Sequence, residues 1–110
     1  FMEGAMNLKT QLDGEELTAF VSGDIDHHNA VMLREKVDRQ IAELRPRSLV
    51  IDLSGVGFMD SSGLGFIMGR YRAMASRGGR VAVQGDTGRV AKILGMSGAY
   101  KYVEHREEIK

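Results

Sequence analysis

Most of the side chains that could carry out chemistry in this chain lie in two short polar clusters. The first cluster is Asp60, Ser61 and Ser62, between a predicted strand and a predicted helix. Ser61 is a candidate nucleophile, but a serine nucleophile needs a nearby base, and the GxSxG pattern of serine hydrolases is absent. Asp and Ser are also among the best helix N-caps, where each stabilises a helix by about 1 kcal/mol relative to Ala. Capping alone would therefore account for these residue types.

The second cluster is Asp26, His27 and His28, which precedes another predicted helix. Asp and His both bind divalent cations, so this run could hold a metal ion. Adjacent histidines rarely point at a single ion, however, and the one other histidine is His105 near the end of the chain. We therefore favour a structural interpretation, in which Asp26 or Asn29 caps the helix and both histidines are solvated.

Three glycines in the helix after the first cluster suggest a contact surface. Gly63, Gly65 and Gly69 each cost about 1 kcal/mol relative to Ala, so another molecule or a neighbouring element should approach the backbone there. A helical projection places Phe66 and Arg70 opposite the expected core arc, which predicts that Phe66 is exposed. It could form the centre of a protein contact surface or be an ordinary exposed apolar residue. The expected core arc consists of Leu64, Ile67, Met68, Tyr71, Met74 and Ala75.

The elements that must position these residues alternate along the chain. A turn signal at Asp13, Gly14 and Glu15 predicts a β-hairpin between the first two strands. The predicted strands are 8–12, 17–22, 48–53, 80–84 and 100–103, and the predicted helices start near Asn29, Ser61 and Thr87. This β-β-α-β-α-β-α-β order predicts an α/β fold with a single mixed sheet and helices packed against it, because parallel neighbours need crossover helices.

Composition restricts the function classes. The 110 residues, 43% of them hydrophobic, are enough for one domain with its own core. Fifteen basic and fifteen acidic residues give a net charge of zero, which argues against a nucleic-acid partner. The absence of cysteine excludes disulfides and thiolate metal sites. No apolar run is long enough to cross a bilayer and no signal peptide pattern is present, so we expect a cytoplasmic protein without a membrane partner.

No motif predicts a cofactor or an enzyme active site. Gly55 and Gly57 do not complete a dinucleotide-binding or phosphate-binding loop. The turn from Gly85 to Arg89 could receive an anion at a helix N-terminus, but we favour a turn in which Thr87 caps the helix. We therefore expect neither cofactor nor catalysis. Residues 1–5 begin with Phe rather than Met and are expected to be a cloning remnant or a disordered end, which leaves 6–110 as the domain.

Three motifs carry a resemblance to a known family. They are FMDSSGLG at 58–65 followed by IMGRY at 67–71, GDIDHHNA at 23–30, and LGMSG at 94–98. Over nearly its whole length the chain resembles the anti-sigma factor antagonists, and it is most similar to the sporulation members of that family in spore-forming Firmicutes. The resemblance implies the sulfate transporter and anti-sigma antagonist (STAS) fold, which agrees with the element order above.

The resemblance also implies a regulatory mechanism. In this family, the serine directly after the aspartate is phosphorylated by a partner that is both anti-sigma factor and serine kinase, and the matching residue is Ser61. The unphosphorylated antagonist binds the anti-sigma factor and frees the sigma factor. The phosphorylated form cannot bind until a serine phosphatase restores it. Together with the residues singled out above, this gives an expected partner-binding surface of Asp26, His27, Asp60, Ser62, Gly63, Gly65, Phe66, Gly69 and Arg70.

The chain departs from the family pattern at three places. Asp24 replaces a glutamate, Phe66 replaces a smaller aliphatic residue, and residues 104–110 can supply at most two turns of the usual final helix, which would leave the last strand less covered. Two other interpretations stay open. One is a STAS scaffold or lipid-transport accessory subunit outside sigma control, and the other is a small phosphoester hydrolase using Ser61 or the pair Asp26 and His27.

Overall fold

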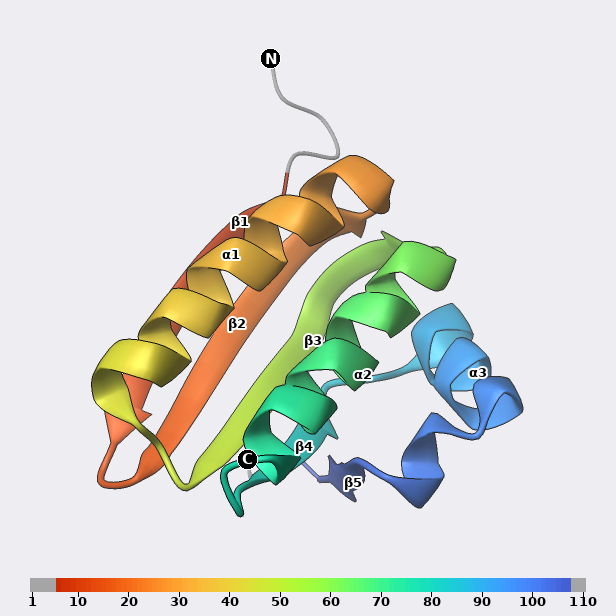
Figure 1. The fold of residues 1–110 in the computed structure, drawn as a ribbon. Coiled ribbons are helices and arrows are strands. Elements are labelled where there is room, and N and C mark those ends of the chain that lie inside the picture. The colour runs from red at the N-terminus through yellow and green to blue at the C-terminus, as the bar shows by residue number, and fades with distance from the viewer. Residues whose placement is uncertain (1–5, 108–110) are drawn as a thin grey trace.

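The computed structural model describes residues 6–107, which form one five-stranded mixed sheet with helices against it (Figure 1). The strand order in the sheet is the same as in the chain, from β1 to β5. The strands are β1 (Asn7–Asp13), β2 (Glu16–Ile25), β3 (Ser48–Met59), β4 (Arg80–Gln84) and β5 (Glu104–Arg106). The helices are α1 (His27–Leu44), α2 (Ser61–Ala75) and α3 (Gly88–Ser97), followed by a 3₁₀ turn (Ala99–Lys101). The predicted α/β fold class and mixed sheet are confirmed.

The sheet begins with the predicted hairpin. Asp13 pairs with Glu16 across a tight turn in which Gly14 has a left-handed φ of 62°. A residue with a side chain is strained in that conformation, which explains the glycine. β1 is thus antiparallel to β2, whereas β2, β3, β4 and β5 are parallel to one another.

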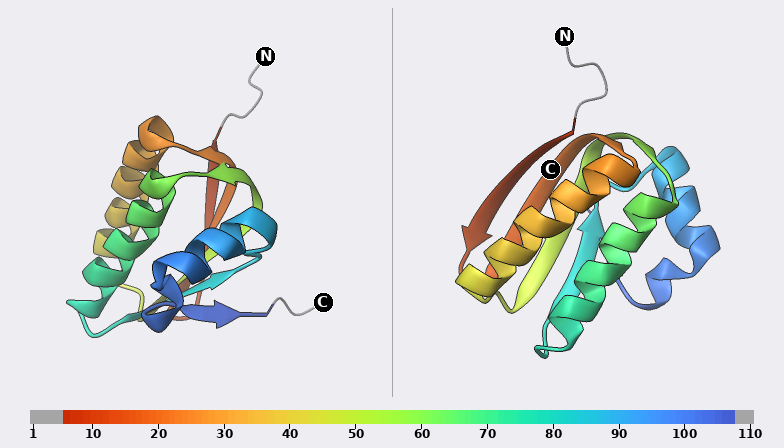
Figure 2. Two further views of the ribbon diagram at one scale, coloured as in Figure 1. Left: turned by 90° about the vertical axis from the view of Figure 1, so that its right-hand side faces the viewer. Right: turned by 45° about the horizontal axis from the view of Figure 1, so that its top comes forward.

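Each pair of parallel neighbours is connected by one helix. Right-handed crossovers between strands that are adjacent in both chain and sheet place successive helices on the same face. Accordingly, α1 and α2 lie side by side over one face of the sheet, and α3 lies beyond α2, away from α1 (Figures 1 and 2). Among residues 6–107, no helix combines the length and apolar character needed to span a bilayer.

The core lies between the sheet and these helices. Alternate residues of the strands face α1 and α2, as the side-chain period of two in a strand requires. The buried positions include Leu17, Ala19 and Val21 of β2, Leu49, Ile51 and Leu53 of β3, Val81 and Val83 of β4, Leu33, Val37 and Ile41 of α1, and Ile67 and Met74 of α2.

The end of the chain differs from the prediction. The predicted strand 100–103 is wrong, because Ala99 to Lys101 form a 3₁₀ turn and β5 starts at Glu104. Ala99 and Val103 are both buried, and the Val103 N–H donates to the Ala99 carbonyl at 3.0 Å. Their spacing of four residues is helical and not the alternation of a strand. Of the residues expected to supply at most two turns of a final helix, Glu104 to Arg106 form strand β5, and 108–110 lie outside the described residues, as do 1–5.

Candidate functional site

The two polar clusters lie side by side at one edge of the sheet. Ile25 at the end of β2 pairs with Met59 at the end of β3, so Asp26 and Asp60 directly follow paired residues of parallel strands. The Asp60 N–H donates to the Ile25 carbonyl at 3.3 Å, which ties the two strand ends together. Residues 34 positions apart in sequence are therefore neighbours.

Both aspartates cap the helix that follows them. Asp26 Oδ1 accepts from the Asn29 N–H at 2.9 Å, and Asp60 Oδ1 accepts from the Ser62 N–H at 2.8 Å. Asn29 itself is not the cap of α1, because it lies in the first turn and its side-chain amide donates to the Asp24 carbonyl at 2.8 Å. The edge thus presents two adjacent helix N-termini, each with one carboxylate bound to its first turn.

Ser61 is the first residue of α2, and it is exposed. The carbonyl of Asp60 accepts from the N–H groups of Gly63 at 3.0 Å and Leu64 at 3.3 Å, so the helix is regular from its first turn. The Ser61 hydroxyl is consequently accessible to another molecule at the positive end of the α2 dipole.

His27 and His28 are the first two residues of α1, and both are exposed. Within residues 6–107, no group of three or more Asp, Glu or His side chains is arranged to hold a metal ion. The role of Asp26 in this structure is that of a helix cap.

The three glycines of α2 differ in their surroundings. A Cβ at Gly63 would lie 2.2 Å from Met59 Cγ and 3.1 Å from Ile25 Cγ2, so this glycine is needed for packing of α2 onto the strand ends. A Cβ at Gly65 would meet nothing within 4 Å, and at Gly69 only the end of the Arg72 side chain at 3.9 Å. At Gly63 the closely packed neighbours are therefore part of this chain. At Gly65 and Gly69 there is space for another molecule to approach the backbone.

The prediction that Phe66 is exposed is wrong, and so is the placement of Arg70 on an exposed face. Phe66 is 3% and Arg70 is 5% exposed. The Arg70 guanidinium lies 5.4 Å from the centre of the Phe66 ring, and its Nε is 2.9 Å from Asp38 Oδ1 of α1. The projection failed because α2 packs against α1 as well as the sheet, which buries a second face of the helix.

The same error affects the expected core arc. Ile67 and Met74 are fully buried as predicted, whereas Leu64, Met68 and Tyr71 are partly buried and Ala75 is exposed. The buried face of α2 is thus rotated toward α1 relative to the prediction.

A groove of about 270 Å³ lies between the first halves of α1 and α2, next to Ser61. We call it the α1–α2 groove. Its lining residues are His27, Ala30, Val31 and Arg34 from α1 and Ser62, Gly65 and Phe66 from α2. Phe66 therefore borders this groove although almost none of its surface is exposed. Val31 and Arg34 are groove residues that no sequence pattern indicated.

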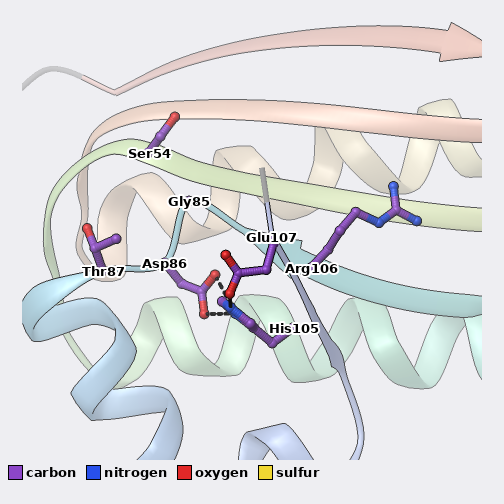
Figure 3. Close-up of a pocket in the computed structure, with 7 residues that line it drawn as sticks. All are labelled: Ser54, Gly85, Asp86, Thr87, His105, Arg106 and Glu107. Atoms are coloured by element: carbon purple, nitrogen blue, oxygen red, sulfur yellow. Dashed lines mark hydrogen bonds and ion pairs between the residues drawn. The ribbon is translucent and has the colours of Figure 1, made fainter. Parts of the chain in front are cut away.

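A larger cavity of about 370 Å³ lies near β5, lined by Ser54, Gly85, Asp86, Thr87, His105, Arg106 and Glu107 (Figure 3). The Asp86 side chain is fully buried, and it accepts hydrogen bonds from the Tyr100 hydroxyl and from His105 Nδ1 at 2.8 Å. Burial, together with this bond to Asp86, raises the pKa of Tyr100. Arg106 extends away from this cluster and forms two bonds of 2.9 Å to Glu16.

The fold agrees with comparisons against known proteins. The STAS domain family matches residues 7–110, so the chain belongs to the STAS domain family.

Similar proteins within that family have been named. The chain is 38% identical over 98 residues to the anti-sigma F factor antagonist of Paenibacillus polymyxa, covering 87% of this chain and 84% of that relative. Its fold is similar to the structure of the anti-sigma factor antagonist SpoIIAA in its unphosphorylated form, with a TM-score of 0.81, 24% identity, and coverage of 96% of this chain and 90% of the other. The phosphorylated form of the Bacillus cell fate determinant SpoIIAA matches with a TM-score of 0.75, 24% identity, and coverage of 96% and 93%.

Proposed function

We propose that this chain is an anti-sigma factor antagonist that binds an anti-sigma factor with serine kinase activity, and that phosphorylation of Ser61 abolishes the binding. The relative in Paenibacillus polymyxa is named an anti-sigma F factor antagonist. The observation that carries the proposal is the exposed Ser61 at the N-terminus of α2, beside the cap carboxylates of Asp60 and Asp26. The chain would act by binding in the cytoplasm and not by catalysis.

The folded domain can accept a phosphate on Ser61. A phosphoserine carries a charge of about −1.5 to −2. At a helix N-terminus the dipole and free N–H groups favour an anion, so the added group has favourable partners within its own helix. Ser61 is also exposed, so no buried contact has to be broken. The switch therefore acts without refolding the domain.

The complex is the species that phosphorylation destabilises. The phosphate adds to the charges of Asp60 and Asp26 and concentrates negative charge on one edge of the sheet. Two like charges about 5 Å apart at an effective dielectric constant near 20 repel by about 3 kcal/mol. A docked partner excludes water from this edge, so the repulsion of the phosphate from Asp60 and from Asp26 has its full effect in the complex. These two repulsions, together with the bulk of the group, offset most of the about 8 kcal/mol that a micromolar complex is worth.

The proposed partner surface combines two kinds of residue. Asp26, His27, Ser62, Gly65 and Gly69 are exposed or partly exposed around Ser61 and would contact the partner. Asp60 would contribute charge as well as the helix cap. Gly63, Phe66 and Arg70 are buried and would support the surface from beneath.

The experiment that tests the proposal is incubation with ATP and a candidate anti-sigma factor from the same organism, followed by mass spectrometry. The expected result is one phosphate on Ser61. Ser61→Ala should accept none, and Ser62→Ala, the matched control for the site assignment, should still accept one phosphate on Ser61. Phosphate on Ser62 with Ser61 unmodified would refute the site assignment.

Binding titrations with the same anti-sigma factor complete the test. Ser61→Ala should bind permanently, Ser61→Asp should bind at least about tenfold more weakly, and a serine phosphatase should restore binding of the phosphorylated protein. If the unphosphorylated wild-type protein does not bind the anti-sigma factor, the proposed function is wrong.

A further inference from the structure

The α1–α2 groove has an apolar base and an open edge. Ala30 and Val31 of α1 and Phe66 of α2 provide apolar surface, with Val31 exposed and Phe66 buried. Space for a Cβ at Gly65 is open to at least 4 Å, so a second backbone can approach this side of α2 closely. A groove of about 270 Å³ has room for one or two apolar side chains.

One end of the groove is positively charged. Arg34, which lines it, is exposed and forms no ion pair with any of residues 6–107. Arg70 lies buried on the adjacent face of α2, stacked on Phe66. Desolvation lowers the pKa of Arg70, the nearby Arg34 and Arg72 lower it further, and Asp38 opposes this shift.

The charge of Arg70 is incompletely satisfied within the chain. Its Nε and Asp38 Oδ1 lie 2.9 Å apart without the alignment of a hydrogen bond, and its buried Nη1 has no hydrogen-bond partner among the described residues. A buried guanidinium with an unused donor favours additional negative charge nearby. None of the residues that line the groove is acidic, so the chain does not supply that charge there.

The opposite end of the site is negatively charged. Asp26 and Asp60 cap the two helices at the edge of the sheet, and Arg34 lies two turns further along α1. A partner that spans both ends meets negative charge beside Ser61 and positive charge beside Arg34. Charge complementarity of this kind fixes the orientation of a docked partner and accelerates association.

We propose that the partner surface around Ser61 extends along α1 into the α1–α2 groove, where the anti-sigma factor inserts an apolar side chain between Val31 and Gly65 and places a carboxylate beside Arg34. This inference rests on the proposed function and names the chemistry of the partner at that site. The partner's carboxylate and Asp38 together offset the positive charge of the guanidinium groups of Arg34, Arg70 and Arg72. The groove therefore fixes the partner's orientation, and the Ser61 edge decides whether it can stay bound.

The test compares two charge reversals on the same helix. Arg34→Glu should weaken binding of the anti-sigma factor about tenfold, which corresponds to about 1.4 kcal/mol. Arg39→Glu is the matched control, because Arg39 is an exposed residue of α1 that lies next to Lys36 and Gln40 beside β1, away from the groove. It should change the dissociation constant less than twofold. The difference between the two variants should shrink in high salt, since salt screens exposed charges.

A charge exchange identifies the partner's carboxylate. Each exposed Asp and Glu of the anti-sigma factor is changed to Lys in turn, and one such variant should restore binding to Arg34→Glu while weakening binding to wild type. Equal binding by Arg34→Glu and Arg39→Glu, with the Ser61 variants still switching, would overturn the groove proposal and leave the proposed function standing. Failure of the unphosphorylated wild-type protein to bind the anti-sigma factor would overturn both the groove proposal and the proposed function.

Discussion

Two acidic clusters follow parallel strands of the same sheet, and they are built in opposite ways. After β2 and β3, Asp26 and Asp60 are partly exposed helix caps beside the exposed Ser61. After β4, Asp86 is fully buried and bonded to Tyr100 and His105. An exposed carboxylate needs no protein partner, whereas a buried one must be hydrogen-bonded or paired. Burial therefore decides which cluster is free for another molecule and which one holds the domain together.

The largest expected effect is a difference in the free energy of unfolding between a substitution in the buried cluster and one in the exposed cluster. Asp86→Ala leaves the Tyr100 hydroxyl and His105 without their acceptor and should lower the free energy of unfolding by about 3 kcal/mol. Asp60→Ala removes a helix cap and should cost only about 1 kcal/mol. Urea unfolding of both variants measures the difference. Equal losses would mean that the buried cluster is no more structural than the exposed one.

The next effect tests the packing of α2 at the site. Gly63→Ala forces a methyl group against Met59 and Ile25 and should destabilise the domain by about 1 to 3 kcal/mol. Gly65→Ala meets open space and should stabilise it by up to about 1 kcal/mol through helix propensity. Thermal melting of the two variants checks the opposite signs. A stabilised Gly63→Ala would show that the side chain of Met59 moves away without cost.

A smaller effect is the response of the buried cluster to alkaline pH. The pKa of Tyr100 is raised in the folded protein, whereas an unfolded tyrosine titrates near pH 10. Above that pH the unfolded chain loses a proton that the folded chain retains, so the free energy of unfolding falls as pH rises. Tyr100→Phe should be less stable at pH 8 but should lose less stability between pH 8 and pH 11 than wild type.

Tyr102→Phe provides the control for this pH dependence, because Tyr102 is exposed. Its stability should fall with pH as steeply as that of the wild-type protein. An unchanged slope in Tyr100→Phe would mean that the alkaline loss of stability arises elsewhere in the chain.

The smallest effect concerns negative charge at the two ends of α2. Ser61→Asp adds an anion at the N-terminus and should leave stability unchanged or raise it by a few tenths of a kcal/mol. Ser76→Asp adds the same charge at the C-cap and should lower stability by about 0.3 to 1 kcal/mol. Parallel urea titrations compare them. A large destabilisation by Ser61→Asp would contradict a switch that acts on the complex alone.

Most of the fold was predictable because its signals are local. The turn residues around Gly14, the apolar run at 49–53 and the helical spacing from Leu33 to Ile41 each depend on neighbours in sequence. β2 and β3 were predicted too short, because Gly23, Gly55 and Gly57 resemble loop residues although the strands continue to Ile25 and Met59. Strand β5 has no apolar alternation, and pairing with β4 alone defines it.

The position of a site residue could be predicted where it depends on a single helix or strand. Its burial could not be predicted where it depends on how two elements pack together. The cap residue Asp60 and the exposed Ser61 follow from a strand that runs into a helix. The burial of Phe66 and Arg70 depends on how α1 lies against α2, which a projection of one helix does not contain. The bond between Asp86 and His105 joins residues 19 positions apart, and no spacing motif signals it.

The strands have the same order in the sheet as in the chain, and this order affects how the protein can fold during synthesis. Each strand pairs with the strand synthesised just before it, so no segment has to wait for a distant one. Pairing each parallel strand with the next one along the chain keeps the crossovers short, which lowers the entropic cost of closing them. During synthesis, the β1–β2 hairpin can form first, each β-α unit can be added as it leaves the ribosome, and the three residues of β5 complete the sheet last.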